Sequence, residues 1–131
     1  MPTIRVPFSI TARPSEPVAS DDPPVVGITT FDKVFAGPGL TGSSVVRMVS
    51  AHDGNGPLAY VALERVQGRL GGIEGTFVLQ HVGSISLGVP SLALVVVTGS
   101  GSAGLAGLSG TGTIEHDDDG ATLTLTYALP A

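Results

Sequence analysis

Hydrophobic and polar residues alternate along much of this chain, in short runs separated by Gly, Pro, Asp and Ser. In residues 3–12 the apolar members of the alternation are Ile4, Val6, Phe8 and Ile10. A period of two places successive side chains on opposite faces of a β-strand. No helical period is sustained anywhere in the sequence. The pattern therefore predicts an antiparallel all-β domain.

Eight runs of this kind can be delimited. The predicted strands cover residues 3–12, 25–35, 43–51, 57–70, 73–83, 90–98, 110–116 and 121–129. Eight strands joined mostly by hairpins would close well into a barrel, which removes the unpaired edges of a sheet, but the pattern by itself also fits a sandwich. The longest gap, residues 13–24, carries four prolines and two adjacent aspartates. We expect a Pro/Asp-rich loop there, and it is the best candidate for a lid.

Length and composition narrow the class of protein. The 131 residues suit a single domain spanning 1–131, and 42% hydrophobic residues against 13% charged residues suit a packed core. A net charge of −5 without any basic cluster argues against nucleic acid as a partner. There is no cysteine, no signal-peptide pattern and no apolar run long enough for a membrane span. We therefore expect a cytoplasmic protein with no membrane partner.

The sixth predicted strand has an unusual composition. Residues 90–98, PSLALVVVT, are apolar at almost every position. A strand whose outer face met water would alternate with polar residues, so continuous apolarity indicates burial on both faces. We expect the core to cover one face and a second subunit to cover the other. The sequence thus predicts a homo-oligomer, either a dimer or a trimer.

The hairpin of residues 60–83 has a register that can be predicted. If Gly71 and Gly72 form a two-residue turn, Leu70 lies opposite Ile73, and the pairing propagates along both strands. Ala62 then faces His81. One face of the hairpin, which we assign to the interior because it carries both aromatic residues, consists of Tyr60, Ala62, Glu64, Val66, Phe77, Leu79 and His81.

Glu64 and His81 are diagonal neighbours in this register, about 7 to 8 Å apart at Cα, so their side chains can meet directly or through a water. Desolvation would raise the pKa of Glu64, and a protonated His81 would lower it. We expect this pair to be the acid/base group of a candidate active site, with Tyr60 as hydrogen-bond donor. The residues expected to contact the ligand are Val66, Phe77, Leu79 and Tyr127.

Three segments together support a family resemblance. They are YVALERVQGRLGGIEGTFVLQHVGS, GSGSAGLAGLSGTG and the closing TLTLTYAL. Over roughly residues 25–129 the chain resembles the family called domain of unknown function 3224, whose members look like allene oxide cyclase barrels. The resemblance implies an eight-stranded antiparallel barrel. It also implies a cofactor-free isomerase or cyclase that holds a small apolar substrate in a ring-closing conformation.

The same residues also allow interpretations without catalysis. A buried Glu and His in one hairpin are more often a structural pair than a catalytic one. The protein is then a non-catalytic barrel that binds a hydrophobic ligand, or an oligomeric scaffold. The glycine-rich residues 99–112 lack the lysine and the following helix of a phosphate loop. His116 with residues 117–119, and His52 with Asp53, favour solvated turns over metal sites.

Overall fold

The computed structural model describes residues 1–17, 24–54 and 56–130, and all the regular structure in these ranges is β. Every strand pairing is antiparallel. The strands are β1 (Thr3–Ala12), β2 (Glu16–Pro17), β3 (Val25–Ala36), β4 (Leu40–His52), β5 (Pro57–Leu70), β6 (Ile73–Ser86), β7 (Val89–Val96), β8 (Ser102–Ala103), β9 (Ser109–Asp117) and β10 (Gly120–Ala128). The predicted all-β class is confirmed.

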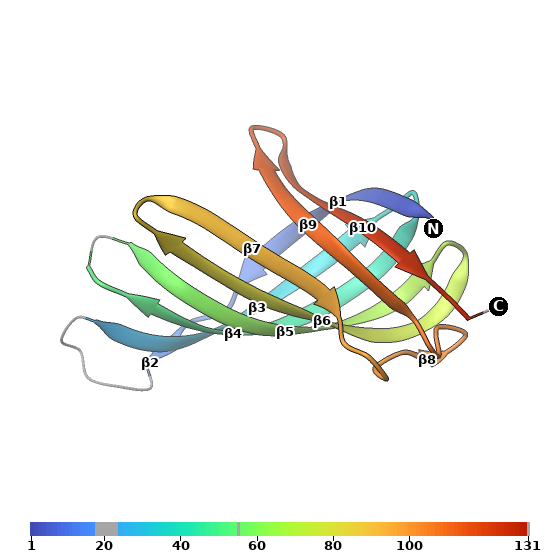
Figure 1. Ribbon diagram of the computed structural model, residues 1–131, viewed down its shortest axis with the longest axis horizontal. Helices are drawn as coiled ribbons and strands as arrows, with labels where there is room; N and C mark the ends of the chain where they lie inside the picture. The colour runs from blue at the N-terminus through green and yellow to red at the C-terminus, as the bar shows by residue number, and fades with distance from the viewer. Residues whose placement is uncertain (18–23, 55, 131) are drawn as a thin grey trace.

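Strand β1 closes the sheet into a barrel (Figure 1). Its first half, Thr3 to Phe8, pairs with β10, and its second half, Phe8 to Ala12, pairs with β3. The remaining order is β10-β9-β7-β6-β5-β4-β3, so eight strands form the closed barrel. The two-residue strands β2 and β8 pair with β3 and β6 outside this ring. The predicted eight-stranded antiparallel barrel is therefore confirmed.

Some predicted boundaries were wrong. The loop expected from Ala36 to Gly42 is shorter, because the β3–β4 ladder continues to the pair Ala36 and Thr41, which leaves residues 37–39 as the turn. Part of the expected loop 13–24 is strand β2, which adds to the edge of β3. Residues 18–23, the centre of the candidate lid, lie outside the described residues. The Gly- and Pro-rich segments correctly indicated where the chain turns, but they did not show how far the strand pairing extends toward each turn.

The β5–β6 hairpin has the predicted register. Leu70 pairs with Ile73, and Ala62 pairs with His81. Gly71 and Gly72 have φ values of +58° and +82°, the left-handed conformation that a tight two-residue turn requires and that glycine adopts without steric cost. The predicted interior face is also confirmed, because Glu64 and His81 are buried.

Apolar side chains close one end of the barrel. The glycine-rich connection from β7 to β9 runs along β6 as β8 and then turns, so that Leu105 and Leu108 become part of the core. The β5–β6 turn lies at this same end, while the β4–β5 and β6–β7 turns lie at the opposite end (Figure 1). The core around this plug includes Phe35, Leu40, Val66, Leu70, Phe77, Leu79, Leu123, Leu125 and Tyr127. The barrel is packed solid at one end.

The outer face of the barrel carries several large apolar side chains that remain exposed to solvent. Val61, Leu63 and Val82 point outward from β5 and β6, and 52%, 56% and 44% of their respective surfaces remain exposed. In β7, Leu94 and Val96 are buried in the core, but Val95 is exposed. The core thus covers one face of β7, as expected. Among the described residues, there is no helix long and apolar enough to cross a membrane.

Candidate functional site

Four neighbouring strands bring four polar side chains together inside the barrel. Glu64 on β5 is 1% exposed, and its Oε1 lies 2.8 Å from His81 Nε2 on β6 and 3.2 Å from Lys33 Nζ on β3. Ser44 on β4 donates its hydroxyl to Glu64 Oε2 over 2.5 Å. The sheet register explains the cluster, since Lys33 pairs with Ser44 and Ser44 is diagonal to Glu64.

The surroundings of Glu64 keep its carboxyl group ionised. Desolvation by burial opposes ionisation, but the hydrogen bond from His81, the charge of Lys33 and the hydroxyl of Ser44 outweigh it. The pKa of Glu64 is therefore lowered from its ordinary value. The sequence had predicted two opposing effects on this group, and the lowering effect prevails because Lys33 and Ser44 join His81. Both carboxylate oxygens are occupied by donors.

A cavity of about 280 Å³ adjoins this cluster. Its polar lining comes from Lys33, His81, Tyr60 and His116, and Glu64 does not line it. The apolar lining consists of Phe8, Ile10, Phe31, Val46, Met48, Ala62 and Ile114. Glu64 thus lies behind the two basic side chains and supports them. Concave apolar walls with a few convergent polar groups are typical of small-molecule sites.

Lys33 and His81 form the polar floor of the cavity. The Nζ of Lys33 lies 4.5 Å from the centroid of the Phe8 ring, a cation–π contact that helps to fix it in place. His81 Nδ1 has no hydrogen-bond partner among the described residues. No described side-chain nitrogen or oxygen is sealed from solvent without a partner, so Nδ1 is not fully sealed, and His81 is one of the residues that line the cavity.

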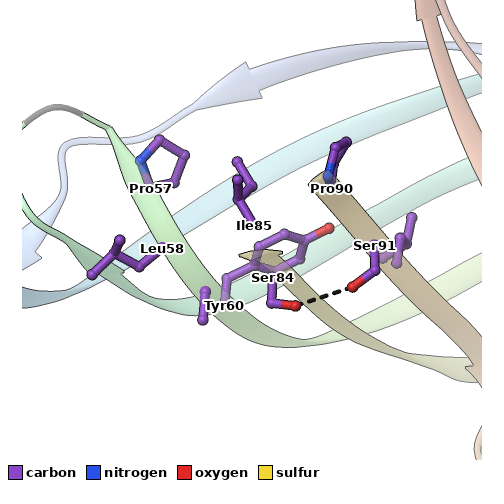
Figure 2. A pocket seen from close by; sticks show the side chains of 9 residues that line it. Pro57, Leu58, Tyr60, Ser84, Ile85, Pro90 and Ser91 are labelled. Carbon is purple, nitrogen blue, oxygen red and sulfur yellow. Dashed lines mark hydrogen bonds between the residues drawn. The ribbon is translucent and has the colours of Figure 1, made fainter. Parts of the chain in front are cut away.

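Tyr60 lies outside the Glu64 cluster, near the start of β5 and so toward the end of the barrel that carries the β4–β5 turn. Its ring packs over Gly83, its partner across the β5–β6 ladder. Figure 2 shows Tyr60 reaching from β5 toward the β6–β7 hairpin, where a second hollow of about 270 Å³ is lined by Leu58, Ile85 and Pro90. Burial raises the pKa of Tyr60, so its hydroxyl stays protonated as a donor. Tyr60 is thus shared by both hollows.

The second hollow has fewer side chains that could bind or transfer a proton. Apart from the Tyr60 hydroxyl, its polar side chains are Ser84 and Ser91, whose hydroxyls lie 3.0 Å apart and bond to each other (Figure 2). No charged side chain lines this hollow among the described residues. Of these two hollows, the cavity that contains Lys33 and His81 is therefore the better candidate site, because its apolar walls meet basic side chains.

The predicted ligand contacts lie elsewhere. Val66, Phe77, Leu79 and Tyr127 are buried in the packed core beneath the cavity and are not among its lining residues. The hydroxyl of Tyr127 instead approaches Gly71 at the closed end. Periodicity identified them correctly as inward-facing, but it cannot tell a filled level of a barrel from a hollow one. Their contact with a ligand stays a prediction.

Sequence reasoning missed Lys33, Ser44 and His116. A usable signal was present for Lys33, since it is the only lysine of the chain and alternates with Phe31 and Phe35 on an inward face. His116 was assigned to a solvated turn but belongs to β9, where it lines the cavity. In the part of the chain that the structure describes, no three His, Asp or Glu side chains gather as they would around a metal ion.

Comparisons with known proteins agree with the fold. Residues 4–128 match a family described as "Protein of unknown function (DUF3224)". The barrel is similar to the crystal structure of a DUF3224 protein of unknown function from Shewanella oneidensis MR-1, with 31% sequence identity, a TM-score of 0.84 and coverage of 100% of this chain and 99% of that one. No curated protein matches the chain. The chain belongs to the DUF3224 family.

Proposed function

We propose that the barrel binds a small, mainly apolar molecule in the cavity above Lys33 and His81. The observation that carries this proposal is a hollow of about 280 Å³ whose apolar walls end in two basic side chains held from behind by a buried carboxylate. A cavity of about 150 Å³ in another protein accommodates benzene. By that measure this cavity has room for about eleven non-hydrogen atoms.

The same geometry supports a catalytic form of the proposal, a cofactor-independent isomerase or cyclase. An ionised Glu64 can only accept at Oε1, so His81 must carry a proton on Nε2 and, when neutral, presents the lone pair of Nδ1 to the cavity. His81 is then the general base, and Glu64 is a positioning residue that selects its tautomer. Lys33 and Tyr60 are donors for negative charge that develops on a substrate oxygen.

Binding can be tested with a probe that matches the cavity. We expect 3-phenylpropan-1-ol to cause saturable amide shifts in a ¹⁵N NMR titration, concentrated at residues such as Phe31, Met48 and His81. Ala62→Met fills the cavity and should abolish these shifts, because Ala62 is a lining residue. Ala106→Met adds the same volume at an exposed position outside the cavity and should leave them intact. Absence of saturable shifts in the native protein would overturn the proposal.

Catalysis can be tested separately from binding. The ketone 4-phenylbutan-2-one is of similar size, and its exchange of hydrogen for deuterium next to the carbonyl can be followed by NMR in D₂O. His81 Nδ1 would remove that proton, and Lys33 would stabilise the enolate oxygen. We expect exchange in the native protein to be about a hundredfold faster than in His81→Gln, the lower end of general-base catalysis. Equal rates would favour the non-catalytic alternative, a ligand-binding barrel.

We also propose that a second copy of the chain covers the apolar outer face of the sheet. The registers align Ile28, Val49, Val61, Val82 and Ala93 in one transverse row across five strands. The flanking rows are Thr30, Arg47, Leu63, Gln80 and Val95 on one side, and Val26, Ala51, Ala59, Ser84 and Ser91 on the other. Arg47 is the only ionisable residue in the three rows, so two copies can meet with little charge to desolvate.

The size of this face suits an interface between two copies. At about 30 Å² of sheet per outward residue, three rows of five residues cover about 450 Å² per subunit. Two subunits then bury roughly 900 Å², below the roughly 1,200 Å² of standard stable interfaces and in the range of weak ones. We expect light scattering to detect a dimer, and Val61→Glu to yield a monomer. Val34→Glu, an exposed position outside the rows, is the control. A native monomer at micromolar concentration would contradict this proposal.

A further inference from the structure

The ionisable side chains that line the cavity are three bases and a phenol. They are Lys33, His81, His116 and the neutral Tyr60, and no carboxylate lines the cavity among the described residues. This is unexpected in a chain with a net charge of −5. The cavity holds the only lysine of the chain and two of its three histidines. The cavity is therefore lined by basic groups, although the chain as a whole is acidic.

Glu64 does not remove this preference. It compensates the charge of Lys33, but it lies behind the floor, and donors from His81, Lys33 and Ser44 occupy both of its oxygens. Only one of the three N–H groups of Lys33 is needed for the bond to Oε1. The site therefore has free donors at Lys33 Nζ and at a protonated His81 Nδ1, but no free anionic acceptor among its described lining residues.

We propose that the cavity selects a small apolar molecule that bears one carboxylate, which is bound by Lys33 Nζ and His81 Nδ1. This inference rests on the proposed function and names the class of its ligand. The two side chains are neighbours in the cavity wall, because Lys33 Nζ and His81 Nε2 approach the same oxygen, Oε1 of Glu64, and both residues line the cavity. In this proposal the carboxylate lies between these two side chains, and its apolar part lies against Phe31, Met48 and Ile114.

Binding of such an acid is coupled to uptake of a proton. With Lys33 charged, Glu64 ionised and His81 neutral, the cluster has no net charge, and the incoming carboxylate makes it −1. Protonation of His81 at Nδ1 restores neutrality and supplies the second donor. The groups that face His81 are Glu64 and Tyr60 from β5, Lys33 from β3 and His116 from β9. Of these groups only Glu64 is negatively charged, and its charge is already paired with that of Lys33.

Three matched probes test the inference on the native protein by calorimetry: 3-phenylpropanoate, 3-phenylpropan-1-ol and 3-phenylpropylamine. We expect the acid to bind about tenfold to a hundredfold more tightly than the alcohol at pH 6, and the amine to bind most weakly. Affinity for the acid should decrease as the pH is raised, while affinity for the alcohol stays constant. Measurements in buffers of different ionisation enthalpy should show uptake of about one proton per acid bound.

Variants and outcomes separate this inference from the proposed function. Lys33→Met should remove the preference for the acid and keep binding of the alcohol, while Arg65→Met, which removes an exposed cation, should change neither. If acid and alcohol bind equally, or the amine binds best, the inference is overturned and the cavity proposal stands. If none of the three binds, the cavity proposal itself fails. Should Lys33→Met not fold, the order of affinities and the proton uptake of the native protein still decide.

Discussion

His81 Nε2 lies 2.8 Å from Oε1 of Glu64, and both side chains are almost fully buried. The contact is direct and connects two residues that are diagonal neighbours in the β5–β6 ladder. It restrains the orientation of the imidazole ring and leaves Nδ1 without a hydrogen-bond partner among the described residues. Because Lys33 and Ser44 bind the same carboxylate, a change at Glu64 affects the whole floor of the cavity.

Removal of the central carboxylate should destabilise the barrel strongly. Glu64→Leu leaves Lys33 buried without its acceptor, and breaking a buried ion pair in this way costs about 3–5 kcal/mol. The double variant Glu64→Leu with Lys33→Met should recover part of this loss, because it removes the unpaired charge as well. Urea denaturation followed by circular dichroism measures both. If the double variant loses more unfolding free energy than the two single variants lose together, this view of the cluster is contradicted.

The unfolding free energy should decrease in acid because of Glu64. Its folded-state pKa is lowered from the ordinary value of 4.5, so the native state binds fewer protons than the unfolded state as the pH falls through this region. The stabilisation is fully present above about pH 5.5 and is lost progressively below pH 4.5. We expect Glu64→Gln to be less stable at neutral pH but to show a flatter acid dependence. Glu74→Gln, at an exposed position in the same hairpin, should retain the native slope.

The plug at the closed end should contribute substantially to stability. Leu105 is 0% exposed within the core, so Leu105→Ala leaves a cavity and should lower the unfolding free energy by about 2–5 kcal/mol. Leu87→Ala removes the same atoms from a fully exposed β6–β7 turn and should cost almost nothing. Thermal denaturation compares the two. Equal costs would show that the connection from β7 to β9 does not seal the barrel.

Gly83 should be required for the position of Tyr60. A Cβ at residue 83 would lie 2.3 Å from the Tyr60 ring, so Gly83→Ala must displace the ring and should cost about 1–3 kcal/mol. In a Tyr60→Ala background the same change should be nearly neutral, because the obstructing ring is gone. A double-mutant cycle measured by urea denaturation isolates this coupling. Additive effects would mean that the ring does not rest on Gly83.

Local sequence patterns were sufficient to locate the eight strands of the barrel and to set the register of one hairpin. Period-two alternation marks strands because successive side chains point to opposite faces. Gly71 and Gly72 fixed the β5–β6 register because a two-residue turn leaves a single pairing. From that register alone, Glu64 and His81 were correctly placed as inward-facing diagonal neighbours. Both the alternation and the turn depend only on residues that are close in sequence, so they can be predicted from one sequence without knowledge of the fold.

Only the tertiary structure decided how the interior is divided. Lys33 reaches Glu64 from a strand 31 residues away, and its presence settles the ionisation of the carboxylate that desolvation alone would have opposed. Whether an inward position meets packing or empty space depends on the strands across the barrel and on the plug formed by Leu105, so Val66 and Phe77 are core while Phe31 and Met48 line the cavity. The sequence alone determined which residues point inward, because that depends on local geometry. Which of them enclose a cavity depends on contacts between distant segments, and those exist only in the closed barrel.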